Sequence, residues 1–244
     1  PGLFIAESPK VIERALRAGY QPASLLVEEK ALTRDLADLD HEMAANQTSG
    51  LGQTPIYVAN SKLLRQLPGY NLLRGALAAM HRVKRLELAD FLATMPAEHP
   101  RIAVLESVVN PANIGAIFRS AAALGIDGVI VTSDSADPFY RRSSRVAMGT
   151  VFQVPWTYVD AKTWQHAGID LLHQAGYQTA AMALRHNTVS IDDPKLTAVD
   201  RLAIIMGSEG PGLKEATIGQ SDFTIKIPMA PGVDSLNVAA ASAL

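Results

Sequence analysis

The sequence contains no cysteine, which excludes disulfides and thiolate zinc sites. Because a reducing compartment suits such a chain, we expect a cytoplasmic protein. The six histidines show no spacing typical of metal ligands, so we expect no metal. No apolar run approaches the roughly 20 residues that cross a bilayer, and we expect no membrane association.

A surplus of positive charge is also missing. The 244 residues carry 22 Lys and Arg against 24 Asp and Glu, a formal net charge of −2. Binding of nucleic acid would therefore depend on local basic patches. Two patches are present, although a solvated surface explains either one taken alone. Their candidate RNA-binding residues are Arg82, Lys84, Arg85, Arg141, Arg142 and Arg145.

The length suits two modest domains, each able to bury a core. Residues 94–100 include two prolines and lack apolar periodicity, so we place a linker there. Short strands alternate with helices in residues 1–93, which predicts a small α/β domain. The strands are predicted at 3–7, 25–27, 55–59 and at a segment that ends near 82, and the helices at 9–18, at 33–45 and from 61. Because the chain begins at Pro1 rather than at Met, we expect it to be part of a longer protein.

Residues 101–244 also alternate strands with helices. Strands are predicted at 102–109, 128–132, 150–154, 177–184, 202–206 and 223–227, and helices at 113–124 and 164–174. This alternation predicts an α/β fold with a mostly parallel sheet and helices on both faces.

Two of these strands end in loops suited to a ligand. The apolar run 202–206 leads into the glycine-rich loop 207–212, and the run 223–227 leads to a loop that ends near a helix start, for which Asp234 or Ser235 is the predicted cap. Ligands of parallel α/β sheets bind at this carboxyl edge. Two ordinary turns would explain the same glycines. The loop is neither a P-loop nor a GxGxxG turn.

A third segment, NPANIGAIFRSA at residues 110–121, follows the strand 102–109. Together with the 207–212 loop and IPMAPGVDSLNVA at 227–239, it resembles the three motifs, in order, of the SpoU (TrmH-like) family of RNA 2′-O-ribose methyltransferases in the SPOUT superfamily. The resemblance spans residues 101–244. A weaker one links residues 1–93 to the RNA-binding domain of the family.

The resemblance implies a carboxyl-terminal trefoil knot, S-adenosylmethionine as methyl donor, rRNA or tRNA as substrate, and a homodimer. It also implies donor contacts at Gly207, Ile227, Ser235 and Leu236. Leu184 and Met229 are expected to form walls of the same site. Plain core packing is the alternative for Ile227, Met229 and Leu236.

The catalytic residues implied by the resemblance are Asn113, Arg119, Ser235 and Asn237, and Glu209 is expected to orient Arg119 or the substrate. An arginine is effectively always protonated, so Arg119 suits the clamping of a phosphate better than a role as base. An ordinary helix cap is the alternative for Asn113. Ala239 stands where the family commonly has serine, which puts one auxiliary hydrogen bond in doubt.

Two other functions remain compatible with the residues. A non-catalytic RNA-binding protein could keep the same fold. A nucleotide-dependent enzyme on a Rossmann-like sheet would instead need a GxGxxG turn with an acidic residue about 20 positions later, and the sequence has neither.

Overall fold

The structure is a computed structural model that describes residues 2–32, 54–64, 66, 76–185, 187–208, 210–233 and 235–244. The predicted helix at 33–45, Glu209 and Asp234 lie outside the described residues. The chain forms two compact units. One consists of residues 1–84 with 138–153, and the other of residues 85–137 with 154–244.

The first unit contains a four-stranded sheet in the order β1 (Leu3–Glu7), β4 (Ala76–His81), β2 (Pro22–Glu28) and β3 (Ile56–Ala59). Only β2 and β3 pair in parallel. Helix α1 (Pro9–Arg17) begins with a proline in its first turn and buries its apolar stripe, as predicted. The short elements η1 (Glu29–Ala31) and α3 (Ser61–Leu64) follow β2 and β3, respectively.

Residues 138–153 complete this unit with α6 (Arg141–Val146) and the 3-10 turn η3 (Thr150–Phe152). The ring of Phe139 stacks on Phe4 with centroids 4.5 Å apart, and Phe152 stacks on Phe4 at 5.6 Å. The predicted strand at 150–154 is therefore wrong. The left-handed Gly149 starts a tight turn that directs Phe152 into this aromatic cluster.

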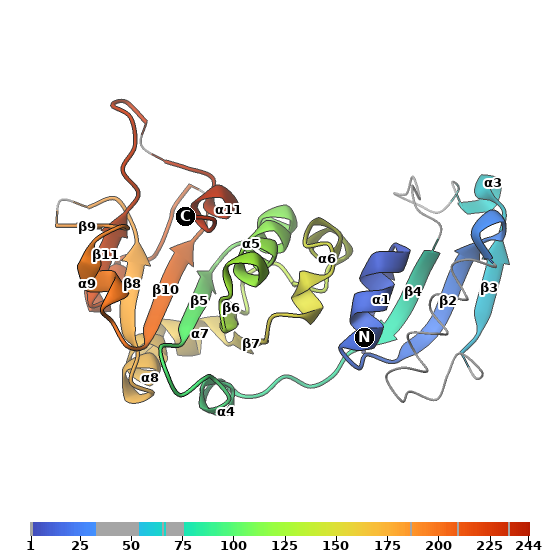
Figure 1. Cartoon of the computed structure of the whole chain (residues 1–244), viewed down its shortest axis with the longest axis horizontal. Helices are drawn as coiled ribbons and strands as arrows, with labels where there is room; N and C mark the ends of the chain where they lie inside the picture. The colour runs from blue at the N-terminus through green and yellow to red at the C-terminus, as the bar shows by residue number, and fades with distance from the viewer. Residues whose placement is uncertain are drawn as a thin grey trace. The chain divides into compact units, whose positions relative to one another are not determined.

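The second unit contains a seven-stranded sheet in which every pair is parallel, which confirms the predicted fold class (Figure 1). Its order is β7 (Trp156–Val159), β6 (Gly128–Thr132), β5 (Arg101–Glu106), β10 (Leu202–Gly207), β8 (Gln178–Met182), β11 (Phe223–Lys226) and β9 (Val189–Ser190). The strand order reverses between β5 and β10, where such sheets hold ligands.

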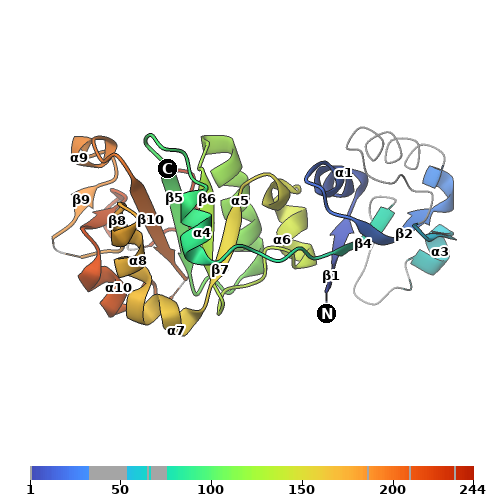
Figure 2. The ribbon, with the colours of Figure 1, turned by 90° about the horizontal axis from the view of Figure 1, so that it is seen from below.

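Helices cover both faces of this sheet. Helix α5 (Pro111–Leu124) connects β5 to β6 on one face (Figure 1). On the opposite face, α7 (Ala161–Thr163), the π-helical turn η4 (Trp164–Gly168) and α8 (Ile169–Gln174) connect β7 to β8. Helix α4 (Leu88–Ala93) and α10 (Glu215–Gln220) pack on the α8 face (Figure 2). Helix α9 (Pro194–Thr197) packs on the other face, and α11 (Val238–Ala241) contacts α5.

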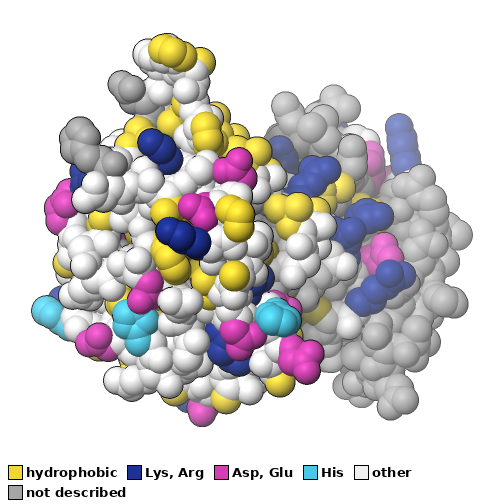
Figure 3. All heavy atoms as spheres, turned by 60° about the vertical axis from the view of Figure 1, so that its left-hand side comes forward, with side chains coloured by type: hydrophobic (Ala, Val, Ile, Leu, Met, Phe, Trp, Pro, Cys, Tyr) yellow, Lys and Arg dark blue, Asp and Glu magenta, His cyan; other side chains and the backbone are white. Residues whose placement is uncertain are grey.

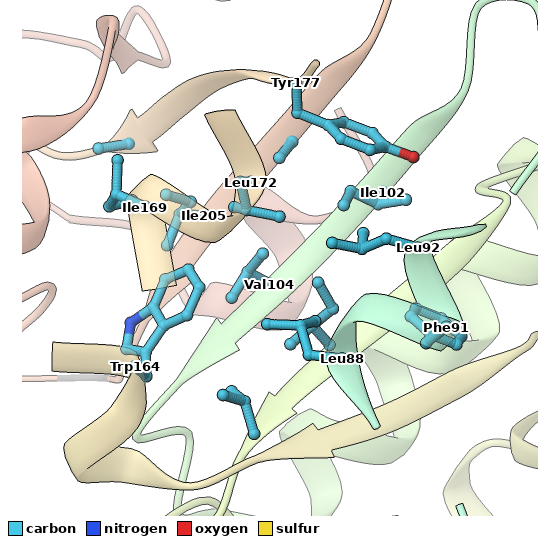
Figure 4. Packing of buried hydrophobic residues seen from close by; sticks show 14 of the residues in the cluster. Leu88, Phe91, Leu92, Ile102, Val104, Trp164, Ile169, Leu172, Tyr177 and Ile205 are labelled. Atoms are coloured by element: carbon cyan, nitrogen blue, oxygen red, sulfur yellow. The ribbon is translucent and has the colours of Figure 1, made fainter. Parts of the chain in front are cut away.

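The main core lies between the sheet and the α4 and α8 layer. Figure 4 shows Trp164 and Leu172 beside Val104 and Ile205, and Tyr177 beside Ile102. Alternate residues of the same strands face the opposite layer, so the near-continuous apolar strands read from the sequence are buried on both sides. None of the described helices is long and apolar enough to cross a membrane.

The predicted boundaries of 1–93, 94–100 and 101–244 stay a prediction. Residues 138–153 pack with the first unit although they fall in the second predicted domain. Helix α4, which directly precedes the predicted linker, belongs to the core of the second unit. The trefoil knot also remains an implication of the resemblance.

Candidate active site

A cavity of about 520 Å³ opens at the carboxyl ends of β8, β10 and β11. Residues 235–241 close one side of it. The structure thus brings together residues from four separate segments of the chain. All six predicted donor contacts line this pocket: Leu184, Gly207, Ile227, Met229, Ser235 and Leu236.

Gly207 is required by the loop that follows it. A Cβ atom at this position would lie 2.5 Å from the carbonyl carbon of Gly212 and 2.5 Å from the nitrogen of Leu213. The loop folds back because the N–H of Gly212 donates to the carbonyl of Ser208, 3.2 Å away. Only a glycine lets the backbone come this close, so Gly207 sets the shape of one wall of the pocket.

Glu106 holds the far end of the same loop, and the sequence analysis missed it. Its side chain is 1% exposed at the end of β5, and in the strand register it lies beside Gly207. Its Oε2 accepts from Trp164 Nε1 at 2.6 Å and from Thr217 Oγ1 at 2.6 Å, and its Oε1 accepts from the backbone N–H of Lys214 at 2.8 Å. A lone acid inside the apolar strand IAVLE was the available signal, because a buried carboxylate needs partners.

Asn113 and Asn237 join the first and third motifs. Asn113 is buried, and its Oδ1 accepts from Nδ2 of Asn237 at 3.3 Å. Asn113 is not the helix cap, because the side chain of Asn110 caps α5. Asn237 also caps α11 through its Oδ1, so the predicted cap at Ser235 is wrong. The pocket wall is thereby tethered to α5.

Arg119 lies six residues beyond Asn113 on α5, so the two residues are about 120° apart around the helix axis. Its side chain is exposed and forms no hydrogen bond or ion pair with any residue that the structure describes. Such a guanidinium is available to an external anion. Glu209, its predicted neighbour, lies outside the described residues.

A polar cluster orders the turn between β5 and α5. Burial raises the pKa of Asp134, but hydrogen bonds from Ser107 and Thr132 outweigh that effect, and the pKa lies below its usual value. Ser107 Oγ donates to Asp134 Oδ2 at 2.6 Å, which helps to hold Ser107 at a φ of 55°. This cluster fixes the backbone that leads to the first motif.

Four of the six predicted RNA-binding residues have partners within the protein. Glu7, only 4% exposed, accepts from Arg141 Nε at 2.6 Å and from Arg145 at 3.4 Å. Arg85 lies over the ring of Trp156, and Arg82 donates to the carbonyl of Leu3.

Lys84 and Arg142 are exposed. Figure 3 shows Lys and Arg side chains of the second unit scattered among acidic and uncharged ones on the face in view. The RNA-binding assignment stays a prediction. The described residues also contain no group of three or more His, Cys, Asp or Glu side chains suited to a metal ion.

A doubly wound parallel sheet with a pocket at the carboxyl ends of β8, β10 and β11 is typical of an α/β domain that binds a small molecule. Comparison with protein families identifies the family to which this domain belongs. The model of the SpoU rRNA methylase family matches residues 100–244, more than half of the chain. The chain therefore belongs to this family and is a methyltransferase.

Two relatives illustrate the similarity. The chain is 37% identical over 244 residues to an uncharacterized tRNA/rRNA methyltransferase of Mycobacterium tuberculosis, covering 99% of this chain and 78% of the relative. It is also 37% identical over 179 residues to the 23S rRNA (guanosine-2′-O-)-methyltransferase RlmB of Vibrio vulnificus, covering 70% of this chain and 67% of the relative.

Solved structures agree with this fold. The AdoMet-bound rRNA methyltransferase from Sinorhizobium meliloti superposes with a TM-score of 0.77 at 25% identity, covering 99% of this chain and 84% of the other. The SpoU methyltransferase AviRb from Streptomyces viridochromogenes gives a TM-score of 0.78 at 24% identity, covering 99% and 86%. The latter likeness concerns the fold alone.

Proposed function

We propose that this protein transfers a methyl group from S-adenosylmethionine to the 2′-hydroxyl of a ribose in rRNA or tRNA. The observation that carries the proposal is the hydrogen bond between Asn237 and Asn113. It ties the wall of the carboxyl-edge pocket to α5, the helix that presents the exposed Arg119. A donor pocket and an anion-binding side chain are thus parts of one tethered assembly.

The pocket suits the methyl donor in size and chemistry. Its volume of about 520 Å³ is in the range of small-molecule sites. Leu184, Ile227, Met229 and Leu236 supply apolar walls for an adenine ring. The loop after Gly207 brings backbone N–H and C=O groups to the cavity, where they can bond the polar edges of a ligand.

When bound, S-adenosylmethionine supplies a methyl group activated by its sulfonium. The residues of this chain have to place a ribose hydroxyl in line with that methyl group. We assign the grip on the neighbouring phosphate to Arg119, because its planar fork of donors matches a phosphate and it keeps its charge. Orientation of this kind lowers the barrier without a change in protonation of Arg119.

The polar residues of the third motif hold the geometry. Asn237 uses both ends of its amide for Asn113 and for the start of α11, so we assign it a positioning role. Ser235 lines the pocket and can donate a hydrogen bond to either ligand. Glu209 keeps its proposed role of orienting Arg119 or the substrate.

The proposal is tested by incubating the purified protein with donor labelled in its methyl group and with separate pools of rRNA and tRNA that lack modifications. We expect the label to enter one of the two RNA pools. Arg119→Ala should abolish most of the transfer while the donor still binds. Binding of the donor without label in either pool would contradict the proposal and favour a non-catalytic RNA-binding role.

We also propose that the protein acts as a homodimer, as its resemblance to the family implies. Light scattering should then give twice the chain mass of 26.1 kDa. A monomer that retains full methyl transfer would refute this part.

A further inference from the structure

The charge of the donor pocket is uneven. Among the described residues that line it, Arg185 and Lys226 are the charged side chains, and both are positive. They come from neighbouring strand ends, because the N–H of Ala183 donates to the carbonyl of Ile225 at 3.1 Å. The cavity is largely apolar and has two positive side chains at one edge. Such a cavity is suited to a ligand that carries an anionic group at one end.

Arg185 already binds a carboxylate. Its Nη2 forms an ion pair with Oε1 of Glu215, and the two side chains are 44% and 83% exposed. Glu215 does not line the cavity, so the guanidinium stands between the pocket and this outer carboxylate. An ion pair between such exposed groups is weak, and Arg185 can exchange Glu215 for a better placed partner.

The apolar walls leave one part of the proposed donor without a partner. They suit adenine and the methylene groups beside the sulfur, but the amino-acid end carries a carboxylate that loses water when it enters the pocket. A charge-assisted hydrogen bond from a guanidinium compensates this loss better than a neutral donor does. Arginine also offers two parallel donors, whereas the ammonium of Lys226 is a point charge.

Building on the proposed function, we propose that Arg185 binds the carboxylate at the amino-acid end of the methyl donor. Arg185 thereby makes the pocket select the complete donor over fragments that contain adenosine but lack the amino acid. Glu215 holds the guanidinium at the pocket edge until the ligand replaces it. Arg185 is thus a specificity residue at the edge of the pocket.

Calorimetry with two ligands isolates this contact. S-adenosylhomocysteine carries the amino acid, and 5′-methylthioadenosine lacks it. We expect Arg185→Gln to weaken S-adenosylhomocysteine about tenfold, in line with the loss of a hydrogen bond between charged groups, and to leave 5′-methylthioadenosine within about twofold. Because Arg185 is exposed, the variant should unfold at the wild-type temperature.

Two matched variants sharpen the test. Lys226→Gln removes the same charge from the same lining and should weaken S-adenosylhomocysteine by less than about threefold. Glu215→Gln removes the competing carboxylate and should leave that affinity equal to or above the wild-type value. Equal losses in the Arg185 and Lys226 variants would mean that only the general field matters, and would overturn the assignment.

The remaining outcomes separate this inference from the function on which it rests. If Arg185→Gln weakens both ligands equally, Arg185 shapes the pocket and does not read the carboxylate, while the donor site stands. If Arg185→Gln changes neither affinity, the inference is wrong. If the wild-type protein binds neither ligand, the proposed function fails and the inference fails with it.

Discussion

Replacement of Glu106 by glutamine tests how the donor loop is held. The carboxylate accepts three hydrogen bonds in a fully buried position: from Trp164, from Thr217 and from the backbone of Lys214. Glutamine keeps the shape but has one acceptor oxygen. If that oxygen serves Trp164 and Thr217, the amide NH₂ group faces the N–H of Lys214, and one buried donor loses its partner.

The size of the effect follows from these bonds. Hydrogen bonds to a charged group contribute about 1.5–3 kcal/mol each, against about 1 kcal/mol for neutral pairs. One bond is lost and two are weakened, while relief from burying a charge offsets part of the cost. We expect the free energy of unfolding of the second unit to fall by about 2–4 kcal/mol. Because Lys214 ends the donor loop, affinity for S-adenosylhomocysteine should fall as well.

The assay is urea unfolding at neutral pH, followed by fluorescence of the two buried tryptophans, Trp156 and Trp164, together with calorimetry of the folded protein. Thr217→Val removes one of the three bonds and keeps the carboxylate, so it should cost about 1.5–3 kcal/mol at most. Unfolding of Glu106→Gln within about 0.5 kcal/mol of wild type, with unchanged ligand affinity, would refute the reasoning.

Three further predictions follow from single residues. Gly207→Ala should weaken donor binding at least about tenfold, because the added Cβ meets the backbone of the returning loop. The control variant Gly219→Ala has open space around its Cβ inside α10, so it should bind the donor normally and be more stable by about 0.5–1 kcal/mol. Arg119→Ala and Arg119→Lys should each lower single-turnover methylation about 100-fold at saturating donor with donor affinity unchanged, and near-normal turnover would show that Arg119 is only a surface residue. Burial raises the pKa of Asp222, but hydrogen bonds from Thr179 and His173 outweigh that effect, so the pKa in the folded protein lies below its usual value. Asp222 therefore stabilises the fold at a pH above its unfolded-state pKa, and this stabilisation is lost as the pH falls through its folded-state pKa. Asp222→Asn should therefore reduce the unfolding temperature at neutral pH, and the difference from the wild type should shrink only as the pH falls below about 4 and through the folded-state pKa, so a difference that does not change with pH would contradict this account.

The sequence predicted the parts of the fold that rest on local patterns. Strand 128–132 matches β6 residue for residue, and Gly125 ends α5 in the left-handed conformation. The glycine-rich loop and the third motif converge on one pocket because the carboxyl ends of parallel strands share an edge. Position in a repeating α/β pattern was enough to predict this.

Contacts between distant segments were not predictable in the same way. Glu106 meets Thr217 across 111 positions, and Arg141 meets Glu7 across 134. The strand predicted at 150–154 failed because Phe152 packs against Phe4, a partner that no local pattern reveals. Periodicity reports which face of an element is apolar and is silent on which element covers that face.

The central claim is that the methyl group reaches a ribose oxygen of RNA. The most direct measurement is mass spectrometry of nucleosides from RNA that the protein has methylated with deuterated donor. The account predicts the heavy methyl group on the sugar fragment, at a nucleotide whose 3′ phosphodiester bond resists alkali because its 2′-hydroxyl is blocked. A heavy methyl group on the base fragment, or alkaline cleavage at the labelled nucleotide, would contradict it.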